Sequence, residues 1–269
     1  MSIINDLNSL LNNLKSQFNN ETPIIDNLKV VRERQEYVFE TDILSQEHLT
    51  KLAEKYHPDS LIISEELDNY QDIEQHSQSL VVMDPLDGTH NYFFGLPKWG
   101  LSYTVFSESK EPVESYIGLP MLDTLLVYAS EKVTLYSIAS TEPIRIIDNI
   151  KTKTPLSEQM IAFDNQFYKD PVIMKKNYNL LIDNAFTTRI SGSSVFDIGM
   201  LLVSRLNARI WHDTEIYDVA PAFAFFKDLG GILNLETGSP ATLSDKRIIC
   251  TTDVTLYDQL QRLGFNKGY

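Results

Sequence analysis

Apolar residues recur at helical spacing in two segments near the start of the chain. Between residues 3 and 18 they fall every three or four positions, which places them on one face of a helix. The segment "SQEHLTKLAEKY" has similar spacing and predicts a second helix from about Ser45, its N-cap. Both helices are therefore expected to cover a core with one side and face solvent with the other. The apolar face of the first helix consists of Ile3, Ile4, Leu7, Leu10, Leu11, Leu14 and Phe18.

Short runs of strand-forming residues dominate the rest of the first half. The segments "SLIIS", "SLVVMD", "LSYTVF", "ESYIGL" and "TLLVYAS" predict successive strands. From about residue 150 strand and helix patterns take turns, which predicts helices layered against sheets. Because no repeat and no Gly/Ser linker interrupts the chain, we expect one unit over residues 1–269, with a strand-rich α+β lobe at 1–145 and an α/β lobe at 146–269.

Composition excludes several classes of protein. A length of 269 residues with 43% hydrophobic residues is enough for a large core. A net charge of −14 argues against nucleic-acid binding, which needs Lys and Arg to neutralise phosphates. No apolar run is long enough to span a membrane, and the polar N-terminus does not resemble a signal peptide. With Cys250 as the single cysteine, which excludes an internal disulfide, a cytoplasmic location is the expectation.

Acidic residues lie at the ends of several predicted elements. Glu65 and Glu66 follow one strand, Asp84 and Asp87 follow the next, and Asp218 opens a helix. Side chains at strand ends can converge on one crevice, which is where open α/β sheets bind ligands. Converging carboxylates repel one another unless a hard cation such as Mg²⁺ or Mn²⁺ lies between them. Asp42, which ends the segment "VFETD", belongs to the same set of acidic residues.

The turn "DPLDGT" gives this idea a concrete geometry. Its proline would fix the turn so that Asp84 and Asp87 face the same side, with the carbonyl of Leu86 as a neutral oxygen ligand. Gly88 would let the backbone approach a ligand closely, and its N–H and that of Thr89 would point at a phosphate if a helix begins there. Taken alone, the same letters fit an ordinary Asx-type turn equally well.

Read together, the motifs resemble those of the inositol monophosphatase family. The segments "VFETD", "SEE", "DPLDGTHNYFFGLPKWGLS", "RISGSSVFDIG" and "YDVAPA" match the family's motifs in order and spacing over most of the chain. The resemblance implies a layered αβαβα sandwich of the sugar-phosphatase type. It also implies a Mg²⁺-dependent, lithium-sensitive phosphomonoesterase, usually a homodimer, that acts on a small phosphate ester. Two or three Mg²⁺ ions per site are implied, with Mn²⁺ as an alternative and Li⁺ or Ca²⁺ as inhibitors.

Carried over residue by residue, the resemblance assigns roles to the acidic set. Glu65, Asp84 and the Leu86 carbonyl would hold one metal, and Asp84, Asp87 and Asp218 a second. Glu65 would also help to position a water activated by the metal for in-line attack on phosphorus. Thr89, hydrogen-bonded to Asp42, would orient or deprotonate that water. Phosphate and substrate contacts are expected from Gly88, Thr89, Gly192, Ser193, Ser194 and Asp213, although residues 192–194 equally fit a plain helix N-terminus.

Departures from the family pattern concentrate around the alcohol of the substrate. Where the family has an acidic residue that contacts inositol hydroxyls, this chain has Trp211, so that His212 or Asp213 would have to substitute. A family lysine corresponds to Val31, with Arg32 and Arg34 close by. Pro221 replaces an alanine inside a predicted helix, where a proline is tolerated only in the first turn.

Three functions are consistent with these residues. The first is hydrolysis of an inositol monophosphate or a related sugar phosphate. The second is a 3′(2′),5′-bisphosphate nucleotidase or fructose-1,6-bisphosphatase activity, for which Trp211 would offer a face to a base. The third is a catalytically degenerate binding protein, which would have no need to keep all the acidic residues together.

Overall fold

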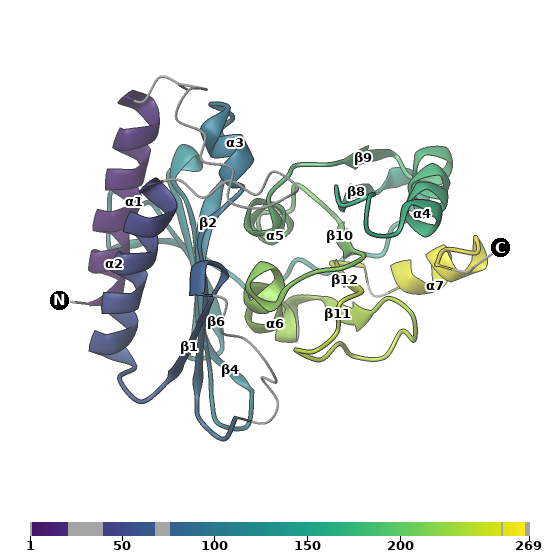
Figure 1. Cartoon of the computed structure of the whole chain (residues 1–269). Helices are drawn as coiled ribbons and strands as arrows, with labels where there is room; N and C mark the ends of the chain where they lie inside the picture. Colours follow the sequence, from purple (N-terminus) through teal and green to yellow (C-terminus); the bar gives the residue numbers. More distant parts are fainter. Residues whose placement is uncertain (1, 21–39, 68–75, 254, 267–269) are drawn as a thin grey trace.

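Helices and sheets stack as five alternating layers. The computed structural model describes residues 2–20, 40–67, 76–253 and 255–266. Figure 1 shows α1 and α2 outside a large sheet, α5 and α6 between the two sheets, and α4 and α7 outside the smaller one. This confirms the αβαβα sandwich expected from the sequence. The main helices are α1 (Ile3–Asn20), α2 (Glu40–Tyr56), α3 (Thr89–Phe93), α4 (Pro171–Asn184), α5 (Ser194–Leu202), α6 (Ile216–Leu229) and α7 (Leu256–Arg262).

The first sheet has seven strands in the order β1-β2-β3-β4-β5-β6-β7. β1 and β2 are parallel, and all later neighbours are antiparallel. The last two strands were missed by sequence reasoning, because much of each faces solvent and neither contains a long apolar run. The strands are β1 (Leu61–Ser64), β2 (Leu80–Asp87), β3 (Gly100–Phe106), β4 (Pro112–Leu119), β5 (Thr124–Ala129), β6 (Lys132–Tyr136) and β7 (Pro143–Ile147).

Strand β2 is buried on both faces, which explains its continuous apolar run. Val81 and Met83 pack in the cluster that includes residues of α1 and α2. Leu80 and Val82 point the other way, into a cluster that includes Ile216 of α6. This double burial fixes the end of β2, where two of the predicted metal ligands lie.

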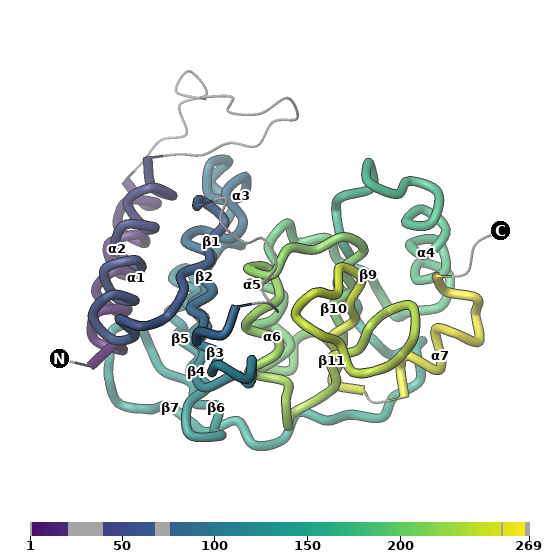
Figure 2. The backbone as a smooth tube through the Cα atoms, turned by 60° about the horizontal axis from the view of Figure 1, so that its bottom comes forward, coloured from purple at the N-terminus to yellow at the C-terminus, as the bar shows by residue number. Residues whose placement is uncertain are grey.

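The second sheet has five strands in the order β11-β12-β10-β8-β9, with β10, β8 and β9 parallel. Its strand β10 alternates between two layers. Ile210 packs in the cluster with residues of α4 and α7, whereas Trp211 packs in the cluster between the sheets. Figure 2 shows α5 and α6 between the two sheets from another direction. The strands are β8 (Met160–Phe163), β9 (Thr187–Arg189), β10 (Ala208–Trp211), β11 (Gly231–Asn234) and β12 (Ile248–Thr251).

Two details of the predicted helices are wrong. Ser45 is not an N-cap: α2 begins at Glu40, and the buried Ser45 hydroxyl donates to the carbonyl of Pro85 at 2.7 Å. Pro221 lies beyond the first turn of α6, and the helix continues through it to Leu229. Within the described ranges, every helix falls short of the length and apolar content needed to cross a membrane.

Candidate active site

Three carboxylates, two of them buried and that of Asp218 half-buried, converge where the large sheet meets α6. Asp84 and Asp87 come from the end of β2, and Asp218 comes from the first turn of α6. Each offers an oxygen atom within 4.8 Å of the others. The pairing of β2 with β3 shifts register between Asp84 and Asp87, so both side chains reach the same site despite their odd spacing. The structure thus brings these three predicted ligands together.

The turn after β2 is tightly packed. The N–H of Leu86 donates to Asp84 Oδ1 at 3.1 Å, which is an Asx-type contact inside the site itself. Gly88 has φ +86°, and a Cβ there would lie 2.9 Å from the carbonyl oxygen of Lys98. Only glycine adopts this conformation in this space without strain. α3 begins at Thr89, which meets the condition set for N–H groups that point at a phosphate.

The N-terminus of α5 holds the side chain of Asp87. Ser194 N and Val195 N donate to its two carboxylate oxygens at 3.1 and 2.7 Å, and the Ser193 hydroxyl also donates to it. Ser193 is at the same time the N-cap of α5, because its Oγ accepts from Phe196 N at 3.1 Å. The predicted substrate segment therefore contacts a predicted metal ligand, which links the two halves of the chain. Gly192, with φ +79°, lies against the side chain of Asn91.

Electrostatic strain marks the cluster as a cation site. Burial, reinforced by the neighbouring carboxylates, raises the pKa of Asp218 to about 7. Burial raises the pKa of Asp87 to about 6, although its hydrogen bonds to α5 oppose the shift. Burial raises the pKa values of Asp84 and Glu65 well above their usual range, reinforced by the charge of Glu65 on Asp84 and by the charge of Asp218 on Glu65. A divalent cation would relieve this repulsion, and the all-oxygen donor set fits Mg²⁺ or Mn²⁺.

Glu65 lies in a short 3-10 helix directly after β1. Its charge contributes to the raised pKa of Asp84, and Asp218 and Glu66 contribute to its own. Glu65 is thus electrostatically part of the site, while Glu66 is a half-buried neighbour.

Thr89 connects the acidic cluster to Asp42. Its hydroxyl lies 3.1 Å from Asp42 Oδ1 and 3.0 Å from the carbonyl oxygen of Leu86. Asp42 is almost fully buried in the first turn of α2. The hydroxyl can donate a hydrogen bond to either oxygen, while its Oγ lone pairs can accept a hydrogen bond from a water.

Comparison with known proteins shows which family this chain belongs to. A sequence model of the inositol monophosphatase family matches residues 8–263. The chain belongs to the inositol monophosphatase family. Membership of the inositol monophosphatase family identifies it as a phosphatase that acts on phosphate monoesters.

Individual relatives are distant. An uncharacterized protein, y4fL, of Sinorhizobium fredii is 29% identical over 164 residues, which are 59% of this chain and 51% of that protein. A fructose-1,6-bisphosphatase/inositol-1-monophosphatase of Aquifex aeolicus is 23% identical, with 78% of this chain and 76% of the relative covered. The solved structure of an IMPase/NADP phosphatase, complexed with NADP and Ca²⁺, superposes with a TM-score of 0.78 at 20% identity, over 98% of this chain and 94% of that one.

The residues expected to replace the acidic side chain of other inositol monophosphatases lie outside the carboxylate cluster. Asp213 is partly exposed and pairs with Lys169 at 2.9 Å. His212 is buried, and its Nε2 lies 2.9 Å from Asn177 Nδ2 on the far side of the small sheet, where burial lowers its pKa to about 4. Val31, Arg32 and Arg34 lie outside the described residues.

Trp211 does not provide a stacking face. It is 1% exposed and packs in the central core, so the expectation that a nucleotide base stacks on it is wrong. Its indole Nε1 donates to Ser194 Oγ at 3.0 Å, and its ring lies 5.0 Å from the Arg209 guanidinium. Trp211 therefore forms a structural contact between β10 and α5.

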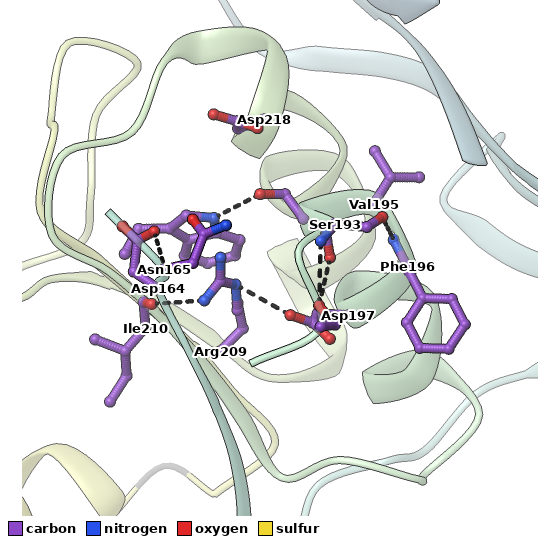
Figure 3. Close-up of polar contacts among 12 residues, drawn as sticks. Asp164, Asn165, Ser193, Val195, Phe196, Asp197, Arg209, Ile210 and Asp218 are labelled. Carbon is purple, nitrogen blue, oxygen red and sulfur yellow. Dashed lines mark hydrogen bonds and ion pairs between the residues drawn. The ribbon is translucent and has the colours of Figure 1, made fainter. Parts of the chain in front are cut away.

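Two charged residues near the site were missed by sequence reasoning. Asp164 follows β8, and its charge contributes to the raised pKa of Asp218. The strand-end argument that singled out Asp84 would have found it. Arg209 counteracts the shift of Asp218 and forms a buried ion pair with Asp197 at 3.3 Å. Figure 3 shows the side chain of Arg209 facing that of Asp197. No motif signals Arg209, because only the fold brings β10 against α5.

Proposed function

We propose that this inositol monophosphatase family member catalyses the Mg²⁺-dependent hydrolysis of a small phosphate monoester, an inositol monophosphate or a related sugar phosphate. The observation that carries the proposal is the convergence of Asp84, Asp87 and Asp218 beside the Thr89–Asp42 pair. These groups come from β2, α6, α3 and α2, and the mutual repulsion of the carboxylates has no structural benefit in itself. A cation that accepts phosphate oxygens gives the arrangement a purpose.

The donor set divides between two metal positions. Glu65, Asp84 and the Leu86 carbonyl would hold one Mg²⁺, and Asp84, Asp87 and Asp218 the other, with Mn²⁺ as a substitute. Bound Mg²⁺ supplies a lowered pKa for water and stabilises negative charge on the attacking and leaving oxygens. Li⁺ and Ca²⁺ are expected to inhibit.

The chain's own residues orient the reactants. Thr89 can accept a hydrogen bond from the attacking water while its own hydroxyl donates to Asp42 Oδ1, 3.1 Å away. Glu65, whose charge contributes to the raised pKa of Asp84, would help to position the same water. The backbone N–H groups of Gly88 and Thr89 open α3 and would bind phosphate oxygens.

A bisphosphate is the second candidate substrate. A 3′(2′),5′-bisphosphate nucleotidase or fructose-1,6-bisphosphatase activity is favoured by one observation, the presence of the buried Arg209 near Asp218. The relative from Aquifex aeolicus carries both a fructose bisphosphatase and an inositol monophosphatase name. A degenerate binding protein is the third option, and the intact set from Asp42 to Asp218 counts against it.

Phosphate release tests the three candidates. The substrates are inositol 1-phosphate, fructose 1,6-bisphosphate, 3′-phosphoadenosine 5′-phosphate and β-glycerophosphate, each with Mg²⁺ and with EDTA. We expect turnover with Mg²⁺ only, abolished in Asp84→Asn. Turnover in EDTA would exclude the metal proposal, and no turnover on any substrate would favour the binding protein.

We also propose that the enzyme is a cytoplasmic homodimer. Three exposed apolar side chains, Phe94, Leu96 and Ile190, lie on two segments joined by the Asn91 Nδ2 hydrogen bond to the Ser191 carbonyl at 2.9 Å. An exposed apolar patch of this kind is typical of a protein–protein contact. The single cysteine, buried Cys250, suits a reducing compartment.

A further inference from the structure

A paired contact between β10 and α5 lies next to Asp87 of the carboxylate cluster. Arg209 and Trp211 lie two positions apart on the strand and share one face, while Ser194 and Asp197 lie three apart on the helix and share one face. The two periodicities match, because Trp211 contacts Ser194 at 3.0 Å and Arg209 contacts Asp197 at 3.3 Å. The result is a fixed polar wall next to Asp87, whose carboxylate binds the N–H of Ser194.

Arg209 is held on three sides in this wall. Its Nε faces Asp197, its Nη1 donates to the carbonyl of Ile210 at 3.1 Å, and its guanidinium lies over Trp211. Arg209 is only 5% exposed, and no described residue accepts a hydrogen bond from its Nη2. Figure 3 shows this third corner of the guanidinium turned away from Ile210 and Asp197, toward the side where Asp218 lies. A buried, preorganised arginine thus has one nitrogen left for a ligand.

Ser194 leaves a second donor in the same place. Its Oγ accepts the indole N–H of Trp211, so its own proton must point elsewhere, and no described residue accepts it. The nearby carboxylate of Asp164 does not compete for these donors, because it already accepts backbone N–H groups of Asn165, Gln166 and His212 at 2.7, 3.3 and 3.2 Å. The wall therefore offers donors to a substrate, where an acidic side chain would offer acceptors.

We infer that Arg209, assisted by Ser194, selects a phosphate ester whose alcohol carries a second anionic group, either a phosphate or a carboxylate. A guanidinium binds such a group with charge-assisted hydrogen bonds, which a neutral hydroxyl cannot match. The inference rests on the proposed phosphatase function and names its substrate class. It ranks a bisphosphate or a phosphorylated acid above an inositol monophosphate.

Steady-state kinetics on matched substrates tests the role of Arg209. Fructose 1,6-bisphosphate carries a second phosphate, 3-phosphoglycerate carries a carboxylate, and β-glycerophosphate carries neither. We expect the wild type to prefer one of the first two over β-glycerophosphate by at least roughly tenfold in kcat/KM, given charged hydrogen bonds of about 1.5–3 kcal/mol. Arg209→Met should remove that preference through KM and leave β-glycerophosphate within about twofold. If only fructose 1,6-bisphosphate loses its preference in the variant, the second group recognised is a phosphate; if only 3-phosphoglycerate does, it is a carboxylate.

Matched variants separate recognition from folding. Arg209→Met alone leaves the buried Asp197 without its cation, so Asp197→Leu/Arg209→Met provides the control with an apolar pair in place of the ion pair. Arg209→Lys keeps the charge and should retain part of the preference. An equal loss on all three substrates in the double variant would assign Arg209 a structural role and overturn the inference, as would a wild type that shows no preference.

A binding measurement tests the role of Arg209 even if the protein has no phosphatase activity. If the wild type hydrolyses none of the substrates, the phosphatase proposal fails, and calorimetric titration with fructose 1,6-bisphosphate and β-glycerophosphate in Ca²⁺ still tests Arg209. Tighter binding of the bisphosphate that is lost in the double variant supports the inference. Equal affinity of both ligands for the wild type contradicts it.

Discussion

The Thr89 hydroxyl has a chemical task that its methyl group does not share. It lies within hydrogen-bond distance of Asp42 and of the Leu86 carbonyl, beside the carboxylate cluster. We predict that Thr89→Val lowers kcat by roughly 10²–10⁴, the usual contribution of a positioned proton-transfer group, and changes KM little. Thr89→Ser keeps the hydroxyl and should keep most activity. Equal activity of the serine and valine variants, measured by phosphate release, would contradict this role.

Asp84 is proposed to bind the metal, but without a metal its buried charge destabilises the folded protein. Its carboxylate is buried beside Glu65, Asp87 and Asp218, and their repulsion is unrelieved without a cation. We predict that Asp84→Asn abolishes turnover, yet raises the melting temperature of the EDTA-treated protein, because one of the repelling charges is gone. Thermal melts with EDTA and with Mg²⁺ measure both effects. Asp228→Asn, at an exposed position on α6, is the control and should change neither.

The residues that sequence reasoning found are those whose chemistry is written in a local motif. Asp84, Asp87 and Asp218 each follow or open an element and belong to a recognisable segment. Arg209 and the Trp211–Ser194 contact could not be predicted, because they depend on the register of β10 against α5. Trp211 was misjudged for the same reason: its side chain points into the core, which the sequence does not reveal.

At the scale of elements, the N-terminus of α5 orients the Asp87 carboxylate through hydrogen bonds. We predict that Ser193→Ala costs about 1 kcal/mol of stability through loss of the N-cap, and also raises the Mg²⁺ concentration needed for activity, because a partner that orients Asp87 is lost. Asp170→Ala removes the N-cap of α4, which accepts from Ile173 N at 3.3 Å, far from the cluster in sequence. Magnesium titrations of both variants should show a shift for Ser193→Ala alone. An identical Mg²⁺ requirement in the Ser193→Ala and Asp170→Ala variants would contradict the role of α5 in orienting Asp87.

Element type was predictable where periodicity was strong, and boundaries were not. The strands of the first half up to β5 and the helices of the second half match their patterns. The start of α2 was misplaced because the serine that resembled an N-cap bonds instead to Pro85, a residue distant in sequence. Pro221 was misjudged because local propensity forbids it in a helix interior, and the packing of α6 between two sheets overrides that preference.

At the scale of the molecule, the proposed dimer can be tested through one side chain. Leu96 is 51% exposed beside Phe94, on the loop that Asn91 joins to Ser191. We predict that the wild type sediments with twice the mass of one chain and that Leu96→Glu sediments as a monomer, because a charge in an apolar contact is costly to bury. Leu122→Glu, at an exposed leucine between β4 and β5, is the control and should stay dimeric. A monomeric wild type in analytical ultracentrifugation would contradict the proposal.

Metal and pH act together on the stability of the whole chain. The folded state raises the pKa of Asp87 to about 6 and of Asp218 to about 7, from an ordinary value of 3.8. Between pH 4 and 7 the folded chain therefore binds more protons at these groups than the unfolded chain does. Their contribution makes the metal-free protein less stable as pH rises through this window.

His212 acts in the opposite direction, so a difference measurement is needed. Its pKa is lowered to about 4, and its contribution to stability is lost as pH falls from about 6.5 toward that value. Because His212 lies away from the cluster, subtracting melts in EDTA from melts in Mg²⁺ cancels its effect. We expect the Mg²⁺-induced rise in melting temperature to be small at pH 5.5 and larger at pH 8, since binding must displace protons from the carboxylates. At pH 8 and a Mg²⁺ concentration 100 times the dissociation constant, metal binding stabilises the folded state by about 2.7 kcal/mol. This corresponds to a rise in melting temperature of roughly 5–10 °C. A rise of the same size at both pH values would show that the carboxylates do not exchange protons for the metal.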